Sequence, residues 1–199
     1  MTKTGIVCAM HEEVQKIVSA LALKPSDAVL GYNTFANQHI TLIESSIGKV
    51  ASAIATAALI EEHQVEHIIN IGLAGALSPI KAGQAFFISS VTQHDAFIPF
   101  ENYQQDMYQR IDCTHPHGEP SATLTTGDQF ITNTSEISDK ADMVDMEGFA
   151  VAYTAKRYQV QATLIKGISD DANDHSEQEL FDNLNLAMDQ TIELLKKVV

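Results

Sequence analysis

His67-Ile68-Ile69-Asn70-Ile71-Gly72 is a short, almost continuously apolar stretch rich in β-branched residues. Such a run is typical of a strand that is buried on both faces of a sheet. It follows residues 49–63, in which apolar residues recur at helical spacing. A helix that leads into a two-sided apolar strand indicates an α/β fold built on a mostly parallel sheet.

The same alternation of strands and helices continues on both sides of this stretch. Further helices are expected at residues 12–22, 147–158 and 177–198. Strands are expected at residues 5–9, 28–35, 40–44, 67–72, 85–91, 122–126 and 162–168. This order predicts a three-layer α/β/α sandwich around a mixed, mostly parallel twisted sheet, with residues 32–40 as a local antiparallel insertion.

Length and charge narrow the classes of function. A chain of 199 residues can bury one substantial core, so residues 1–199 are expected to form a single domain. The 12 basic and 26 acidic residues argue against nucleic acid or an anionic membrane as a partner, because both attract positive surfaces. Two cysteines, no signal peptide and no membrane-spanning stretch predict a cytoplasmic protein that acts on a small molecule.

Three local motifs resemble cofactor or metal sites without meeting their requirements. His63 and His67 have the spacing of an inverted zinc motif, but a helix end between them would separate their side chains. Gly48-Lys49 lacks the earlier glycine of a phosphate loop. Gly72-Leu73-Ala74-Gly75 is only part of a dinucleotide fingerprint, and we interpret it as a tight turn that exposes backbone amides. Neither a metal nor a cofactor is expected.

Three carboxylates stand near the predicted strand ends, where sheets of this kind bind ligands. Asp170 follows an apolar strand, and burial there would favour a protonated form that can donate to a purine nitrogen. Glu147 begins a helix, whose dipole would stabilise an ionised carboxylate able to accept hydrogen bonds from sugar hydroxyls. Glu13, also at a helix start, could hold and deprotonate water. These are the acid, the anchor and the base that hydrolysis of an N-ribosidic bond requires.

From spacing alone, a simpler interpretation of these carboxylates is equally good. A glutamate in the first turn of a helix often serves only the helix dipole, and an aspartate after a strand often only caps the next element. A wider comparison of sequence blocks separates the two interpretations.

Six blocks, in this order along nearly the whole chain, resemble the 5′-methylthioadenosine/S-adenosylhomocysteine nucleosidase family of the nucleoside phosphorylase superfamily. They are GIVCAMHEEV (5–14), SIGKVA (46–51), NIGLAG (70–75), GDQFI (127–131), VDME (144–147) and ISD (168–170). Six co-linear blocks are far more specific than any one of them. The resemblance implies the nucleoside phosphorylase-like fold and hydrolysis of adenine-containing 5′-modified nucleosides.

The resemblance also implies roles for five polar or ribose-binding positions. Glu13 positions the attacking water. Asp170, with Ser169, protonates and holds the adenine. Glu147, with Met146, holds the ribose.

Five apolar positions have implied contacts with the substrate. Phe130 and Ile131 contact the base. Met10, Ile47 and Phe100 border the 5′ substituent, with Phe100 acting across the interface of a homodimer. For each of them, plain core packing is the alternative, since large apolar residues are usually buried for that reason.

Hydrolysis is favoured over phosphorolysis by the scarcity of arginine. A phosphorolytic enzyme must hold a phosphate dianion, usually with arginines, and this chain has only Arg110 and Arg157.

Departures from the family pattern put the substrate in doubt more than the fold. The segment before Gly127 is short, trimmed to residues 106–126, Leu73 replaces a small hydroxyl residue, and Gly148-Phe149 replaces a pair of small residues. Two alternatives therefore remain open: a related nucleosidase for another purine or a futalosine-like nucleoside, and a catalytically weak nucleoside-binding protein.

Overall fold

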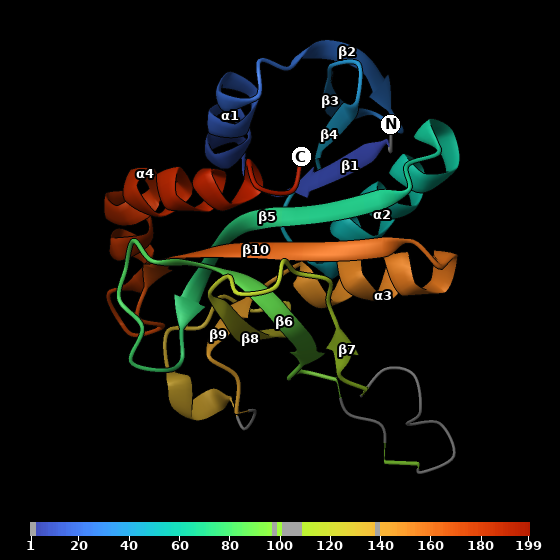
Figure 1. Ribbon diagram of the computed structural model, residues 1–199. Coiled ribbons are helices and arrows are strands. Elements are labelled where there is room, and N and C mark those ends of the chain that lie inside the picture. Colours follow the sequence, from blue (N-terminus) through green and yellow to red (C-terminus); the bar gives the residue numbers. More distant parts are fainter. Residues whose placement is uncertain (1–2, 97–98, 101–108, 138–139) are drawn as a thin grey trace.

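The fold is known from a computed structural model that describes residues 3–96, 99–100, 109–137 and 140–199. Figure 1 shows its helices, α1 (His11–Ala20), α2 (Lys49–His63), α3 (Gly148–Tyr158) and α4 (Ser176–Leu195), with a short 3-10 turn at Thr134–Glu136. The strands are β1 (Thr4–Cys8), β2 (Lys24–Val29), β3 (Tyr32–Ala36), β4 (Ile40–Glu44), β5 (His67–Ala76), β6 (Ala85–Gln93), β7 (Ile111–Asp112), β8 (Ser121–Thr126), β9 (Met143–Asp145) and β10 (Gln161–Asp170).

One mixed sheet contains all of these strands. Parallel pairings join β4 to β1, β1 to β5, β5 to β10 and β6 to β8. The end of β5 also pairs with β9, and β10 also pairs with β6. Since β9 pairs in turn with β8, strands β5, β10, β6, β8 and β9 close into a ring.

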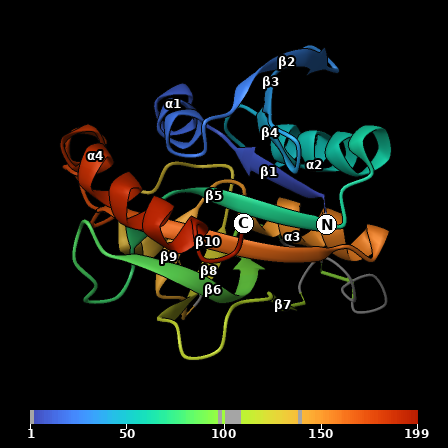
Figure 2. The ribbon, with the colours of Figure 1, turned by 45° about the horizontal axis from the view of Figure 1, so that its top comes forward.

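Helices cover both faces of the central strands, which confirms the predicted α/β/α sandwich. In Figures 1 and 2, α1 and α4 lie on one side of β1, β5 and β10, and α2 and α3 lie on the other. No helix in the described ranges combines the length and apolarity needed to cross a bilayer.

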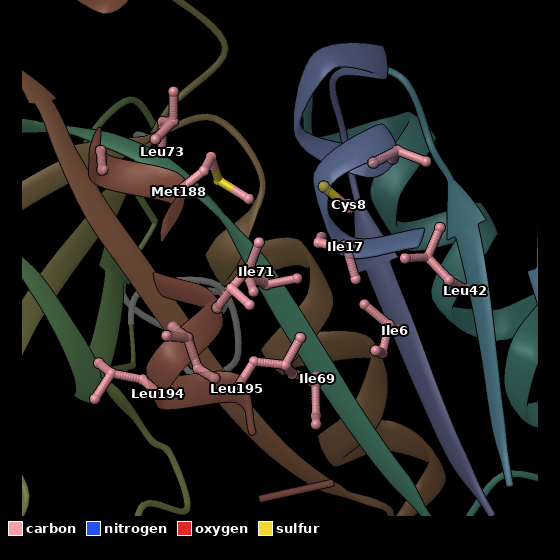
Figure 3. Close-up of a cluster of buried hydrophobic side chains, with 14 of the residues drawn as sticks. Ile6, Cys8, Ile17, Leu42, Ile69, Ile71, Leu73, Met188, Leu194 and Leu195 are labelled. Atoms are coloured by element: carbon pink, nitrogen blue, oxygen red, sulfur yellow. The ribbon is translucent and has the colours of Figure 1, made fainter. Parts of the chain in front are cut away.

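The core follows from the two-residue period of the strands. Ile69 and Ile71 of β5 face α1 and α4, in the cluster drawn in Figure 3, whereas Ile68 packs with α2 and α3. In β1, Ile6 and Val7 divide between the same two clusters. Burying each of these side chains stabilises the fold by about 1.5–3 kcal/mol. The continuous apolar runs are therefore central strands, as their sequence predicts.

The strand predicted at residues 28–35 is wrong. The chain turns at Leu30-Gly31, where φ is 49° and 84°, and so forms the hairpin of β2 and β3. Positive φ values favour glycine, and Gly31 was the available signal for this turn. The start of β2 was not predicted as strand, because its polar residues are exposed and lack an apolar pattern.

The tight turn predicted at Gly72-Leu73-Ala74-Gly75 is also wrong. These residues belong to β5, which continues to Ala76 and pairs with β10 and then with β9. Their backbone lies within the sheet and not in a free loop, although the Leu73 amide donates to the Glu13 side chain at 2.8 Å. The extension of β5 brings Leu73 and its neighbours to the site described next.

Candidate active site

A pocket opens where the carboxyl ends of β1, β5 and β10 meet the segments around Ile47 and Phe130. Nine of the ten predicted site residues line it: Met10, Glu13, Ile47, Phe130, Ile131, Met146, Glu147, Ser169 and Asp170. Leu73 adds an apolar side chain to the wall. Residues from distant parts of the sequence thus meet around one mostly apolar cavity that contains the three predicted carboxylates, Glu13, Glu147 and Asp170, and also that of Asp145.

Glu13 lies in the first turn of α1, with its carboxylate buried against β5. Its Oε1 accepts a hydrogen bond from the Leu73 amide at 2.8 Å, and its Oε2 accepts one from the Met10 amide at 3.1 Å. The Cys8 thiol also donates to Oε2, at 3.3 Å. Burial raises the pKa of Glu13, although these hydrogen bonds and the charge of Lys166 oppose the rise. The carboxylate is therefore fixed in place and is a better base than an exposed glutamate.

Asp170 ends β10, and its carboxyl group is buried at the pocket wall. The Ser169 hydroxyl donates to Oδ2 at 2.7 Å, and the Ala172 amide donates to Oδ1 at 3.0 Å. The Asn183 amide donates to the Ser169 carbonyl at 2.8 Å and ties this end of β10 to α4. Ser169 and Asp170 thus form a hydrogen-bonded polar pair in a pocket whose lining is otherwise mostly apolar.

Glu147 is the residue immediately before α3, and its Oε1 accepts a hydrogen bond from the Gly48 amide at 2.8 Å. Burial, followed by repulsion from Asp145, raises the pKa of Glu147 to about 7. The expectation that the helix dipole keeps this group ionised is therefore corrected, because loss of solvation outweighs a dipole effect of about 1 kcal/mol. Near neutral pH the protonated and ionised forms coexist.

A buried ion pair between Lys166 and Asp145 supports the three carboxylates. The Lys166 ammonium lies 2.8 Å from Asp145 Oδ2, and both side chains are almost fully buried. Asp145 also accepts hydrogen bonds from the Thr126 hydroxyl at 2.6 Å and the Gly148 amide at 2.8 Å. Burial alone would lower the pKa of Lys166, but Asp145, then Glu147 and Glu13, raise it further than burial lowers it. A cation therefore stands among the acidic groups of the site.

Sequence reasoning missed this pair, although a signal was present. Lys166 interrupts the apolar run of residues 162–168. A lysine in a buried strand requires a carboxylate partner, because an unpaired buried charge is strongly destabilising. Asp145, two residues before Glu147, was the available partner.

The rim of the pocket is held by Lys49. Its ammonium lies 2.6 Å from Asp95 Oδ1, and its backbone amide donates to Asp128 Oδ1 at 3.0 Å. These contacts tie the start of α2 to the segment that carries Phe130. Ile47 and Phe130, which are about half exposed, both line the pocket at this rim.

Comparison with known sequences decides the family. The sequence profile of the phosphorylase superfamily matches residues 3–128 and 120–199, which is almost the entire chain. The chain belongs to the phosphorylase superfamily. Its curated relatives in this superfamily include two 5′-methylthioadenosine/S-adenosylhomocysteine nucleosidases. That of Colwellia psychrerythraea is 29% identical over 87% of this chain and 86% of its own length. That of Haemophilus influenzae is 26% identical over 99% of this chain and 98% of its own.

Solved structures of the superfamily share the fold. A Helicobacter pylori nucleosidase mutant with 5′-methylthioadenosine in its active site is 22% identical, with a TM-score of 0.87 over 99% of this chain and 97% of that one. The futalosine hydrolase of the same species is also 22% identical, with a TM-score of 0.85 over 98% and 96%. These likenesses confirm the nucleoside phosphorylase-like fold.

Four further predictions from the sequence concern Phe100, the trimmed segment, the zinc-like histidine motif and Gly48. Phe100 is 65% exposed and is not among the described residues that line the pocket. Of the trimmed segment, residues 106–126, the first three lie outside the described residues, and the rest contains β7 and β8. The two histidines of the zinc-like motif lie on different elements, since α2 ends at His63 and β5 begins at His67. Gly48-Lys49, the motif that resembles a phosphate loop, marks the start of α2, which begins at Lys49.

Glu147→Gln should have a higher free energy of unfolding than the unaltered chain, by an amount that is larger at pH 8 than at pH 5. Because the pKa of Glu147 in the folded state is raised to about 7, this group stabilises the folded protein at pH values below the ordinary pKa of a glutamate. The contribution is lost as pH rises from that value through about 7. The glutamine avoids that loss, so its advantage should grow by roughly 1–3 kcal/mol across this range. Urea unfolding at several pH values measures it. Glu12→Gln, at an exposed position, is the control, and an equal pH trend in both variants would contradict the assignment.

Proposed function

We propose that this chain hydrolyses the N-ribosidic bond of adenine-containing 5′-modified nucleosides, of the methylthioadenosine and S-adenosylhomocysteine type, and releases adenine. The observation that carries the proposal is the convergence of Glu13, Glu147 and Asp170 in one largely apolar pocket. An apolar cavity with a few fixed polar groups suits a flat base and a sugar. The names of the curated relatives support the same substrate class.

The proposed reaction transfers the ribosyl group from nitrogen to water. The bond between C1′ and the base breaks, and its electron pair leaves with the base, which takes a proton from Asp170. The oxygen of water bonds to C1′ and gives a proton to Glu13. Charge that develops on the sugar in the oxocarbenium-like transition state is stabilised by ionised Glu147, which accepts hydrogen bonds from the ribose hydroxyls.

The other pocket residues position the two ends of the nucleoside. Ser169 fixes the Asp170 carboxyl, and Phe130 and Ile131 offer apolar surface to the base. Met146 adjoins Glu147 on the ribose side. The remaining wall, formed by Met10 and Ile47, is the proposed site of the 5′ substituent, for which an uncharged thioether would suit the apolar surroundings.

Water is a better acceptor than phosphate in this pocket. Neither arginine is among the described residues that line it. Lys166 is already 2.8 Å from Asp145, so its charge is offset. A phosphate dianion would also meet the negative fields of Glu13 and Glu147, which repel it in a poorly solvated site.

Purified protein incubated with methylthioadenosine should release adenine at the same rate with and without phosphate. Chromatography of the products measures both rates. A catalytically weak binding protein would instead gain thermal stability with the nucleoside and release no adenine, because binding to the folded state alone stabilises it. Absence of adenine from several 5′-modified adenosines would overturn the proposal.

A second candidate is hydrolysis of a futalosine-like nucleoside or another purine nucleoside. It is favoured by Leu73, which lines the pocket and departs from the pattern of the resembling family. The likeness to a futalosine hydrolase structure shows a shared fold that is compatible with this substrate class. A panel of nucleosides with different bases and 5′ groups separates the two candidates by their kcat/KM values.

The proposed working form is a cytoplasmic homodimer. Val50 and Ile54 are exposed apolar residues on α2, and Ile47 and Phe100 are exposed as well. Burying such a group of side chains between two copies would be favourable. In the dimer, Phe100 of one copy would border the 5′ side of the other copy's pocket. Light scattering on the full chain measures the oligomeric state.

A further inference from the structure

Two glycines of β5 face the two carboxyl groups to which proton transfer is assigned. A Cβ atom at Gly72 would have three atoms of the Glu13 carboxyl group as its nearest neighbours, Oε1 at 3.0 Å, Oε2 at 3.3 Å and Cδ at 3.4 Å. A Cβ atom at Gly75 would lie 3.0 Å from Asp170 Oδ1, with Ala172 and Val144 next. At both glycines, a carboxyl group therefore lies close to the backbone, where a side chain would otherwise be.

Backbone conformation does not account for these glycines. Both lie within β5, in register with β10, and Gly75 also pairs with β9. Glycine inside a strand weakens it, and a strand needs glycine where φ is positive or where another group approaches the backbone closely. Positive φ values among the described glycines occur at Gly31, Gly48, Gly83 and Gly118. Close approach is what remains for Gly72 and Gly75.

We propose that Gly72 and Gly75 are positioning residues for the reaction, because the side chains they lack leave the space occupied by the carboxyl groups of Glu13 and Asp170. The inference rests on the proposed function and deepens it. A single strand then fixes both proton-transfer groups, one on the water side and one on the base side. The motif that resembles part of a dinucleotide fingerprint has this role instead.

A methyl group at Gly72 would move the Glu13 carboxyl and leave the fold largely intact. The crowded atoms are the far end of a flexible side chain, which can shift by a few tenths of an ångström. That shift would disturb the hydrogen bonds that Glu13 accepts from Leu73 at 2.8 Å and from Met10 at 3.1 Å. Small misplacements of a catalytic group cost about tenfold or more in rate, because reaction depends steeply on geometry.

Gly72→Ala should therefore lower kcat for adenine release by about tenfold or more, with KM changed by less than about threefold. Gly5→Ala is the matched control. Its Cβ would meet Ile68, Leu59 and Val65 side chains, each at 3.1 Å, so the crowding is similar but lies in the apolar core. The control should lower the melting temperature and leave kcat unchanged. Equal effects of the two variants on kcat would overturn the proposal.

A double-variant comparison separates positioning from general damage. In a Glu13→Asp background the shorter side chain withdraws from the added methyl group, so Gly72→Ala should lower kcat by less than about threefold there. The same fold-change in both backgrounds would contradict the proposal. At the other carboxyl group, Gly75→Ala should lower kcat by about tenfold or more in the unaltered chain and by less than about threefold in the Asp170→Asn background, because the proton donor whose position matters is already absent there.

A crystal structure of Gly72→Ala tests the inference independently of activity. The expected result is a displaced Glu13 carboxyl above an unmoved β5 backbone. A moved strand with Glu13 in its original contacts would overturn the inference even if the unaltered chain proves to be an active hydrolase. If instead the unaltered chain releases no adenine, the proposed function fails, and the displacement still decides whether Gly72 positions Glu13.

Discussion

Asp170→Asn should lower kcat for adenine release by about a hundredfold or more while leaving nucleoside binding largely intact. The asparagine has nearly the same shape and can still accept a hydrogen bond from Ser169, which donates to Asp170 at 2.7 Å. It cannot transfer a proton to the leaving base. Glu13→Gln should have an effect of similar size. The glutamine side-chain oxygen can still accept the hydrogen bond from the Leu73 backbone amide, but the side chain cannot take a proton from water.

Steady-state kinetics and calorimetric titration with a slowly hydrolysed nucleoside analogue measure the two parts of this prediction. Asp171→Asn is the matched control, because the neighbouring side chain is exposed and is not among the described residues that line the pocket. It should retain full activity. If Asp170→Asn kept kcat within threefold of the value for the unaltered chain, Asp170 would not be the acid. If Glu13→Gln also left kcat unchanged, the alternative of a catalytically weak nucleoside-binding protein would gain support.

Lys166→Met should destabilise the folded protein by roughly 3–5 kcal/mol. The substitution leaves Asp145 buried without the cation that lies 2.8 Å from it. It also removes the positive charge that lowers the pKa of both Glu147 and Glu13. Both groups should therefore stay protonated to higher pH, and the rise of kcat/KM with pH should move upward.

Thermal or urea unfolding and a pH profile of kcat/KM measure these two effects. Lys196→Met removes an exposed ion pair with Glu193 and should change stability by less than about 1 kcal/mol. The double variant Lys166→Met with Asp145→Asn should recover much of the lost stability, since no unpaired charge remains buried. A Lys166→Met variant with unaltered stability and pH profile would show that the ion pair does not support the site.

The fold was largely predictable because central strands leave a clear pattern. The apolar run at residues 67–72 can be buried only between two layers, and the structure places Ile68 and Ile69 in clusters on opposite faces. The hairpin of β2 and β3 was not predictable in the same way. Its first strand, β2, lies at the sheet edge, where solvent exposure removes the apolar signal.

The site was predictable in its members and less so in its electrostatics. Glu13, Glu147 and Asp170 were found from their places at helix starts and a strand end, together with family resemblance. Their surroundings depend on contacts between distant residues, such as Gly48 with Glu147 and Leu73 with Glu13. For the same reason the raised pKa of Glu147 could not follow from its position before a helix. The roles of these residues stay predictions.

The most direct test of hydrolysis is the reaction in water labelled with heavy oxygen, with methylthioadenosine as substrate and with phosphate present. Mass spectrometry of the sugar product locates the label. We predict that the labelled oxygen appears at C1 of the free sugar, in an amount equal to the adenine released. Formation of a sugar 1-phosphate, or adenine release without label in the sugar, would contradict hydrolysis by water at this site.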